Sequence, residues 1–274
     1  MDTALPVEPY LERIGVPPDS VGEPDRTTLE RLQRAHVTTV PFETLAITGA
    51  PFGDGEGEGV CLDTETLYEK VVSRERGGFC FELNGAFGWL LAALGFDVTR
   101  VAARMVGAIE LPANHHPLVV SLDEPYLVDV GMGSPMLRAP LPLGGAAPPD
   151  DAGVAWRLVD SARPDAEYCL RYREQSAAWE DRYVFDTTPR GLSYFAATCE
   201  YLATAPESGF TGDPSVTMAT GDGWLRLTPE TFSRTRVGET EEEPVDPGEY
   251  RERLASAFGI ALDGRSRRKD FLGQ

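Results

Sequence analysis

The chain has 274 residues, 42% of them hydrophobic and 9% aromatic, and this composition excludes an intrinsically disordered protein. A formal net charge of −19 argues against binding to nucleic acid or to an anionic membrane. The N-terminal stretch MDTALPVEPYLERIG has neither a basic start nor an apolar run. We therefore expect no signal peptide and no membrane span, and we predict a cytoplasmic protein.

Arginine supplies nearly all of the positive charge, because Lys70 and Lys269 are the only lysines. Excess acid with little lysine suits a protein kept soluble at molar salt, where charge repulsion is screened within roughly 3 Å. A salt-loving host is one hypothesis for this composition. An acidic protein from a GC-rich genome is the other.

Helices are predicted for most of the first 95 residues. Residues 1–47 carry apolar side chains at helical spacing behind acidic and threonine caps. A glycine-rich loop over 48–60 separates them from a second predicted helix over 63–78, which we expect Gly77 to end. A third helix is predicted to begin at Cys80 and to stop at Gly95.

Short β-rich runs separated by turn residues follow from about residue 96 to 188, and they predict an antiparallel sheet or barrel. Beyond about residue 200 we expect strands within 215–237, an acidic segment at 238–250 and a terminal helix over 249–262. The order of helices, then strands, then a mixed segment predicts an α+β protein of three lobes.

The four cysteines are Cys61, Cys80, Cys169 and Cys199, and none forms a C-x-x-C pair. We therefore expect no metal site, and a reducing cytosol makes disulfides improbable. Cys80 lies in RGGFCFELN, between a glycine pair and the start of a predicted helix. Unpaired N–H groups at a helix start lower the pKa of a thiol, which favours a nucleophile. The alternative is a buried structural cysteine.

A second group of polar residues lies in NHHPLVVSLDEPYLVDVGMG, which we interpret as a hairpin. It brings Asp129 near His115 and His116, and a carboxylate beside a histidine suits a nucleophile–base–acid triad. Side chains alternate along a strand, so only one histidine shares the face of Asp129. Pairing of Asp129 with Val119 selects His115, whereas pairing with Leu118 selects His116. The turn does not decide between these registers.

Taken together, these motifs resemble the arylamine N-acetyltransferases, and the resemblance covers nearly the whole chain. The segments that carry it are RGGFCFELNG, HHPLVV, YLVDVGMG, RAHVTTVPFETL, ATAPESGF and the C-terminal WLRLTPETFSRTR with YRERLASAFGIAL. The resemblance implies a cysteine-protease-like core. It divides the chain into an N-terminal helical bundle over 1–95, an antiparallel β-barrel over 96–200 and a C-terminal α/β lid over 201–274.

Carried over by motif, Cys80 is the nucleophile and Asp129 the orienting acid of a Cys-His-Asp triad. The family histidine lies in an H-x-x-L-x-V pattern, which His115 matches and His116 does not. The resemblance therefore selects His115 as the base and leaves His36 as a structural residue.

Three departures from the family pattern stand out: Thr44 replaces an asparagine, Met132 replaces an aromatic residue, and the histidine is doubled. Met132 bears on amine preference, because a flexible thioether replaces the edge or face of a ring. Arg76 and Glu82 are interpreted as structural. Backbone N–H groups of Phe81 and of residues 102–106 are candidate oxyanion donors.

The resemblance implies an acetyl-CoA-dependent arylamine or hydrazine N-acetyltransferase with ping-pong kinetics. Acetyl-CoA is then a co-substrate and no cofactor is permanently bound. The residues that hold the CoA phosphates, the natural amine and the oligomeric state are left open. The rival interpretations are a cysteine-triad hydrolase, an amide synthase acting on a related thioester, and a non-enzymatic relic.

Overall fold

The structure is a computed structural model that describes residues 5–52, 57–109, 111–175 and 177–262. Its helices are α1 (Glu8–Arg13), α2 (Arg26–Val37), α3 (Leu45–Thr48), α4 (Thr64–Tyr68), α5 (Cys80–Ala93), α6 (Ala196–Thr204) and α7 (Tyr250–Phe258). Short 3₁₀ turns occupy Pro18–Ser20 and Leu192–Phe195, and a π-helical turn continues α4 over Glu69–Ser73. None of the described helices is long and apolar enough to cross a membrane.

The described strands form three antiparallel sheets. One sheet has the order β1 (Phe42–Glu43), β11 (Val216–Ala219), β12 (Gly223–Leu227), β13 (Thr231–Arg236), β14 (Glu239–Pro244). A second has the order β3 (Ala103–Met105), β10 (Glu180–Phe185), β9 (Tyr168–Glu174), β8 (Val154–Asp160), β7 (Ala146–Ala147). The third has the order β2 (Asp97–Arg100), β4 (Leu118–Ser121), β5 (Pro125–Val128), β6 (Leu141–Pro142).

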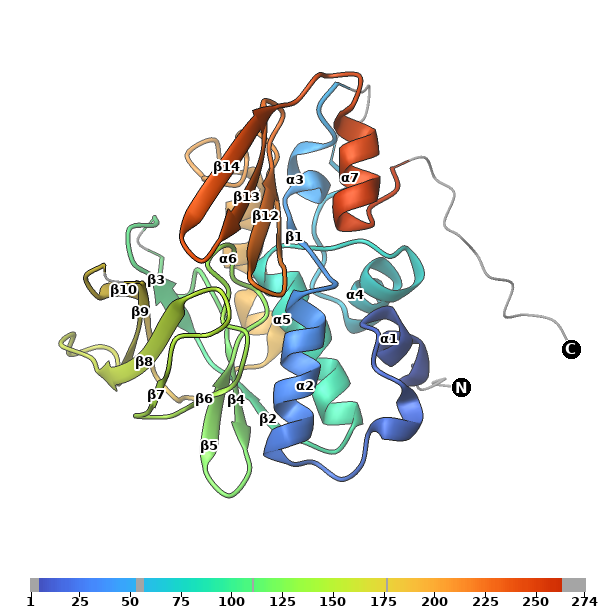
Figure 1. The fold of residues 1–274 in the computed structure, drawn as a ribbon. Coiled ribbons are helices and arrows are strands. Elements are labelled where there is room, and N and C mark those ends of the chain that lie inside the picture. Colours follow the sequence, from blue (N-terminus) through green and yellow to red (C-terminus); the bar gives the residue numbers. More distant parts are fainter. Residues whose placement is uncertain (1–4, 53–56, 110, 176, 263–274) are drawn as a thin grey trace, which may run out of the picture.

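Helix α5 lies at the centre of the fold (Figure 1), with α1, α2 and α4 on one side and the strands β2–β10 on the other. Its sequence is apolar around most of the helix, as a helix enclosed by other elements requires. Leu83, Phe87 and Leu90 pack in one core with residues of α1 and α2 and with Leu118 of β4. The N-terminal end of a fully packed helix is a rigid place for a reactive side chain.

Several of the predicted elements are confirmed, α2 and α5 most clearly. The Asp25 side chain caps α2 by accepting a hydrogen bond from the Thr28 N–H at 2.7 Å, and Leu29 and Leu32 face the core as their spacing predicts. The helical turns that follow Asp63 end at Ser73.

The single barrel predicted for the middle of the chain is not found. The described residues form two antiparallel sheets there and no closed barrel. The reason lies in the strand over 97–105, which is interrupted at Val101 and Ala102, so that its two halves take different partners. β2 pairs with β4 while β3 pairs with β10, and an isolated bridge from Ala103 to His115 links the two sheets.

The acidic segment predicted after residue 237 forms strand β14, and the sequence analysis missed this. In the register with β13, Glu239 lies opposite Arg236 and Glu241 lies opposite Arg234. Opposite charges on facing strands stabilise a pairing that the composition of β14 alone disfavours. Charged side chains also protect an exposed edge strand from pairing with other chains.

Strand β1 ties the N-terminal part of the chain to the C-terminal sheet, because Phe42 pairs with Thr217 of β11. The division into domains over 1–95, 96–200 and 201–274 stays a prediction.

Gly77 does not end a helix, contrary to the prediction, because the helical turn before it already stops at Ser73. A Cβ at Gly77 would lie 2.0 Å from the Pro41 carbonyl oxygen, so this glycine permits a close approach of two backbone segments.

Gly131, which follows β5, permits a similar approach to the start of α5. A Cβ at this position would lie 2.6 Å from the Cys80 carbonyl oxygen and 2.9 Å from its Cα. The segment after β5 therefore passes directly over the backbone of Cys80.

We predict that Gly131→Ala lowers the free energy of unfolding by about 1–3 kcal/mol, because backbone must move to make room. Gly133→Ala is the matched control, since its Cβ would meet nothing closer than the Thr217 hydroxyl at 3.9 Å. Urea denaturation of the two variants measures the difference. Equal stabilities would contradict the close approach.

Candidate active site

Cys80 is the first residue of α5, and its side chain is buried with 4% of its surface exposed. The chain enters the helix through Phe79, whose N–H donates to the Glu82 carboxylate at 3.2 Å. The Phe79 carbonyl accepts from the N–H groups of Glu82 and Leu83, both at 3.0 Å. These bonds fix the first turn and hold the thiol against an apolar cluster that includes Phe81 and Ala102.

The pKa of the Cys80 thiol is raised, contrary to the prediction from its place at a helix start. Burial is the largest cause, and Cys199 and Asp129 add to it, while the Phe81 N–H acts in the opposite direction. The helix terminus does favour the thiolate, but loss of solvation outweighs it. The thiol therefore needs a neighbouring base to take its proton.

The hairpin brings His115 to Asp129. Leu118 pairs with Val128, so the ladder, continued by one residue, places Asp129 opposite Pro117. The observed register is neither of the two considered from the sequence. Pro117 and Val119 lie on the same face of the strand, however, so Asp129 points to the face on which pairing with Val119 would place it, which is the face of His115. The His115 Nε2–H donates to Asp129 Oδ2 at 2.7 Å, and both side chains are buried.

Asp129 accepts three further hydrogen bonds. Oδ1 accepts from Asn84 Nδ2 at 2.9 Å and from the Gly131 N–H at 3.0 Å, and Oδ2 accepts from the Tyr183 hydroxyl at 3.0 Å. Burial on its own would raise the pKa of this carboxyl, but His115, Asn84 and Gly131 together lower it below its usual value. Asp129 is therefore a carboxylate that holds one proton of His115 on Nε2.

His116 points away from Asp129. Its Nε2–H donates to the Phe81 carbonyl at 3.1 Å, and its ring stacks on Phe195 with 4.6 Å between centroids. Burial is the main cause that lowers the pKa of His116 to about 3. This imidazole stays neutral at physiological pH.

His36 lies in the helical core, as the sequence predicted. Its Nε2 is 3.1 Å from the Tyr10 hydroxyl, and its ring contacts Phe87 edge-on. Burial is again the main cause that lowers its pKa, to about 3. The structure does not bring His36 to Asp129.

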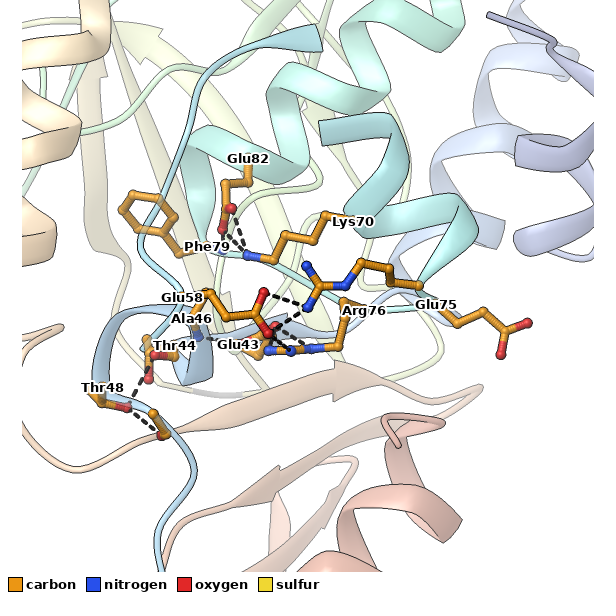
Figure 2. A network of polar contacts seen from close by, with 12 residues as sticks. Glu43, Thr44, Ala46, Thr48, Glu58, Lys70, Glu75, Arg76, Phe79 and Glu82 are labelled. Atoms are coloured by element: carbon orange, nitrogen blue, oxygen red, sulfur yellow. Dashed lines mark hydrogen bonds and ion pairs between the residues drawn. The ribbon is translucent and has the colours of Figure 1, made fainter. Parts of the chain in front are cut away.

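Arg76 pairs with carboxylates, as its interpretation as a structural residue predicts (Figure 2). Arg76 Nη2 lies 2.7 Å from Glu43 Oε1, and Nη1 lies 3.4 Å from Glu58 Oε1. Thr44, where the family often has asparagine, accepts on its hydroxyl from the Ser215 N–H at 3.0 Å. These contacts hold the segments on either side of the RGG motif.

Sequence analysis gave no role to Asn84 and Tyr183, although both hold Asp129. Asn84 could have been found, because it lies four residues after Cys80 and therefore on the same face of α5. Its amide oxygen also accepts from the Val130 N–H at 2.9 Å. Tyr183 carried no signal, since only the pairing of β10 with β3 brings it to the site.

Two other predictions concern substrate groups. Met132 is buried in the core between the β5–β6 and β8–β10 strands, and its part in amine preference stays a prediction. Within 102–106, the N–H of Ala103 donates to His115 O and the N–H of Met105 to Asn114 Oδ1. The Val106 N–H likewise donates to the Arg182 carbonyl. These three cannot serve as free oxyanion donors.

All four cysteines are free, with Cys61 exposed and the other three buried. Among the residues that the structure describes, no cluster of three or more His, Cys, Asp or Glu side chains could hold a metal ion.

Known proteins resemble this chain over nearly its whole length. A family model described as N-acetyltransferase matches residues 25–267. An arylamine N-acetyltransferase of Mycolicibacterium smegmatis is 32% identical over 94% of this chain and 93% of its own. A chicken pineal gland isozyme of the same activity is 30% identical over 94% of each chain. The chain therefore belongs to the arylamine N-acetyltransferase family.

Solved structures show the same fold. The Mycobacterium marinum enzyme in complex with CoA has a TM-score of 0.80 at 30% identity and covers 93% of each chain. A Bacillus cereus enzyme has a TM-score of 0.82 at 26% identity and covers 94% of this chain and all of its own. That enzyme is described as having a Cys-His-Glu triad, so the acid of the triad differs among relatives.

The buried neutral histidines predict a loss of stability in mild acid. Their pKa is near 6.5 in an unfolded chain and about 3 in the fold, so protons bind the unfolded state first as the pH falls. Between pH 7 and 5.5 the free energy of unfolding should fall by about 1 kcal/mol for each of His36 and His116.

His36→Gln tests this, because it removes one titrating group distant from Asp129. Urea denaturation at several pH values should give a shallower decline for the variant than for the parent. Parallel declines would show that His36 is not held neutral.

Proposed function

We propose that this chain is an arylamine N-acetyltransferase that carries the acetyl group on Cys80. The observation that supports this most strongly is the buried hydrogen bond of 2.7 Å between His115 and Asp129, in the same site as a buried cysteine at a helix start. The names of the relatives support acetyl transfer to an arylamine, and the M. marinum complex supports CoA as the carrier.

In the first step His115 acts as the base. Its Nε2–H donates to Asp129, so Nδ1 is the nitrogen that can accept the proton of the Cys80 thiol. The thiolate attacks the carbonyl carbon of acetyl-CoA. The Phe81 N–H acts on the Cys80 sulfur and is our candidate donor for the oxyanion. Ala102 packs in the same cluster as Cys80 and remains a candidate within the 102–106 segment.

Collapse of the tetrahedral intermediate breaks the bond to the CoA sulfur, which takes the proton from His115. CoA leaves, and acetyl-Cys80 remains. An aromatic amine or hydrazine then attacks the thioester, and His115 accepts a proton from the attacking nitrogen. Cys80 leaves as a thiolate and takes that proton from His115, which restores the thiol and the neutral imidazole. Acetyl-CoA is thus a co-substrate, and CoA leaves before the amine reacts, which is the order of events that gives ping-pong kinetics.

The test is the mass of the intact protein after mixing with acetyl-CoA and no amine. We expect the parent to gain one acetyl group, which an added arylamine removes, and Cys80→Ser to gain none. Because the acidic composition leaves a salt-loving host as a hypothesis, the reaction is run in dilute buffer and in molar salt. Steady CoA release without amine would indicate a hydrolase, and absence of both adduct and release would contradict acetyl-CoA as donor.

The two adjacent histidines provide a matched pair of variants. His115→Asn should slow acetylation by about 10²–10⁴-fold, because the base is lost. His116→Asn should slow it less than about tenfold, because this ring is neutral and bonded to the Phe81 carbonyl. The reverse order would reassign the base to His116.

A further inference from the structure

A buried ion pair lies beside the nucleophile. Lys70 Nζ is 2.6 Å from Oε1 and 2.7 Å from Oε2 of Glu82, and the side chains are 8% and 3% exposed. Figure 2 shows the Lys70 ammonium directed at the Glu82 carboxylate from the helical turn that follows α4. Glu82 is the third residue of α5, two residues after Cys80.

Glu82 has two opposing effects on this helix start. Its carboxylate accepts the Phe79 N–H at 3.2 Å, which fixes the residue that precedes Cys80. The same negative charge disfavours a thiolate on Cys80, and Glu82 contributes to the raised pKa of that thiol. The Glu82 carboxylate thus helps to position Cys80 but disfavours ionisation of the Cys80 thiol.

Lys70 resolves this conflict. A cation in contact with both carboxylate oxygens keeps Glu82 ionised, as the cap requires, and cancels its field at the neighbouring sulfur. We propose that Lys70 is a positioning residue for acetyl transfer, which acts by neutralising Glu82 so that the N-terminal field of α5 remains available to the Cys80 thiolate. The inference rests on the proposed role of Cys80 as nucleophile.

The other charged and titratable groups around the pair do not replace Lys70. Cys80 faces Cys199 from α6 and the Asp129 carboxylate, which is bonded to His115. Glu82 faces Lys70, Cys199 from α6 and Glu43 from β1. Burial is the main cause that raises the pKa of Glu82 and Glu43 adds to it, while Lys70 acts in the opposite direction. Among these described groups, Lys70 is the one basic side chain in contact with Glu82.

A second buried pair in the same network serves as a control. Arg76 and Glu43 have side chains 7% and 0% exposed, and unlike Glu82 neither is among the groups that raise the pKa of Cys80. Breaking this pair disturbs the fold nearby and leaves the Glu43 charge acting on Glu82 rather than on Cys80.

The experiment follows alkylation of Cys80 by iodoacetamide against pH, by intact mass, in a Cys61→Ser background because Cys61 is exposed. Lys70→Met should raise the midpoint of the rate profile by roughly one pH unit, and Lys70→Arg should restore it. Glu82→Gln should lower the midpoint, and the double variant should lie between the single variants. Arg76→Met should shift the midpoint less than Lys70→Met does, because Glu43 is not among the groups that act on Cys80.

A merely structural pair would shift the midpoint in the same direction whichever partner is removed, or not at all, and either result would overturn the proposal. If Lys70→Met does not fold, Glu82→Gln and the double variant are compared, and the double variant is expected to have the higher midpoint. An equal or lower one would overturn the proposal. Alkylation needs no acetyl donor, so the midpoints remain readable even if the acetyl adduct does not form.

Discussion

The site depends on one buried carboxylate. Asp129 is fully enclosed, and an unpaired charge in that position would be too costly to bury. Its donors come from separate parts of the fold: His115 precedes β4, Asn84 lies on α5, Tyr183 lies on β10, and Gly131 follows β5. The hydrogen bonds to Asp129 therefore join the central helix to both sheets of the middle segment. One of these bonds also fixes the tautomer of His115.

Cys80 and His115 lie in different surroundings. Cys80 is packed among apolar side chains, whereas His115 is hydrogen-bonded to a carboxylate. Burial in this apolar cluster raises the pKa of the Cys80 thiol. In the mechanism that we propose, the thiol ionises by proton transfer to His115. The start of α5 carries Glu82 as a cap, and Lys70 compensates its charge from a neighbouring helical turn. The second histidine does not compete with His115 for Asp129, because neighbouring side chains point to opposite faces and His116 points toward the Phe81 carbonyl.

Local patterns were sufficient to predict α2, α5 and the place of Cys80 at a helix start, because helical spacing and glycine punctuation are contained in a short stretch of sequence. The choice between His115 and His116 could not be made locally, since it depends on hairpin register. Tyr183 and strand β14 depend on pairing between distant segments, and the separation of the predicted barrel into two sheets depends on a strand that changes partners. The raised pKa of Cys80 depends on burial, which position at a helix terminus does not reveal.

The most direct measurement is ¹⁵N NMR of the imidazole rings, which is tractable because the chain has three histidines. We expect neutral His115 to carry its proton on Nε2. Asp129→Asn should change this tautomer or the position of the ring, while His36 and His116 keep their signals. A proton on Nδ1 of neutral His115, or signals of His115 unaffected by Asp129→Asn, would contradict the claim that this carboxylate organises the site.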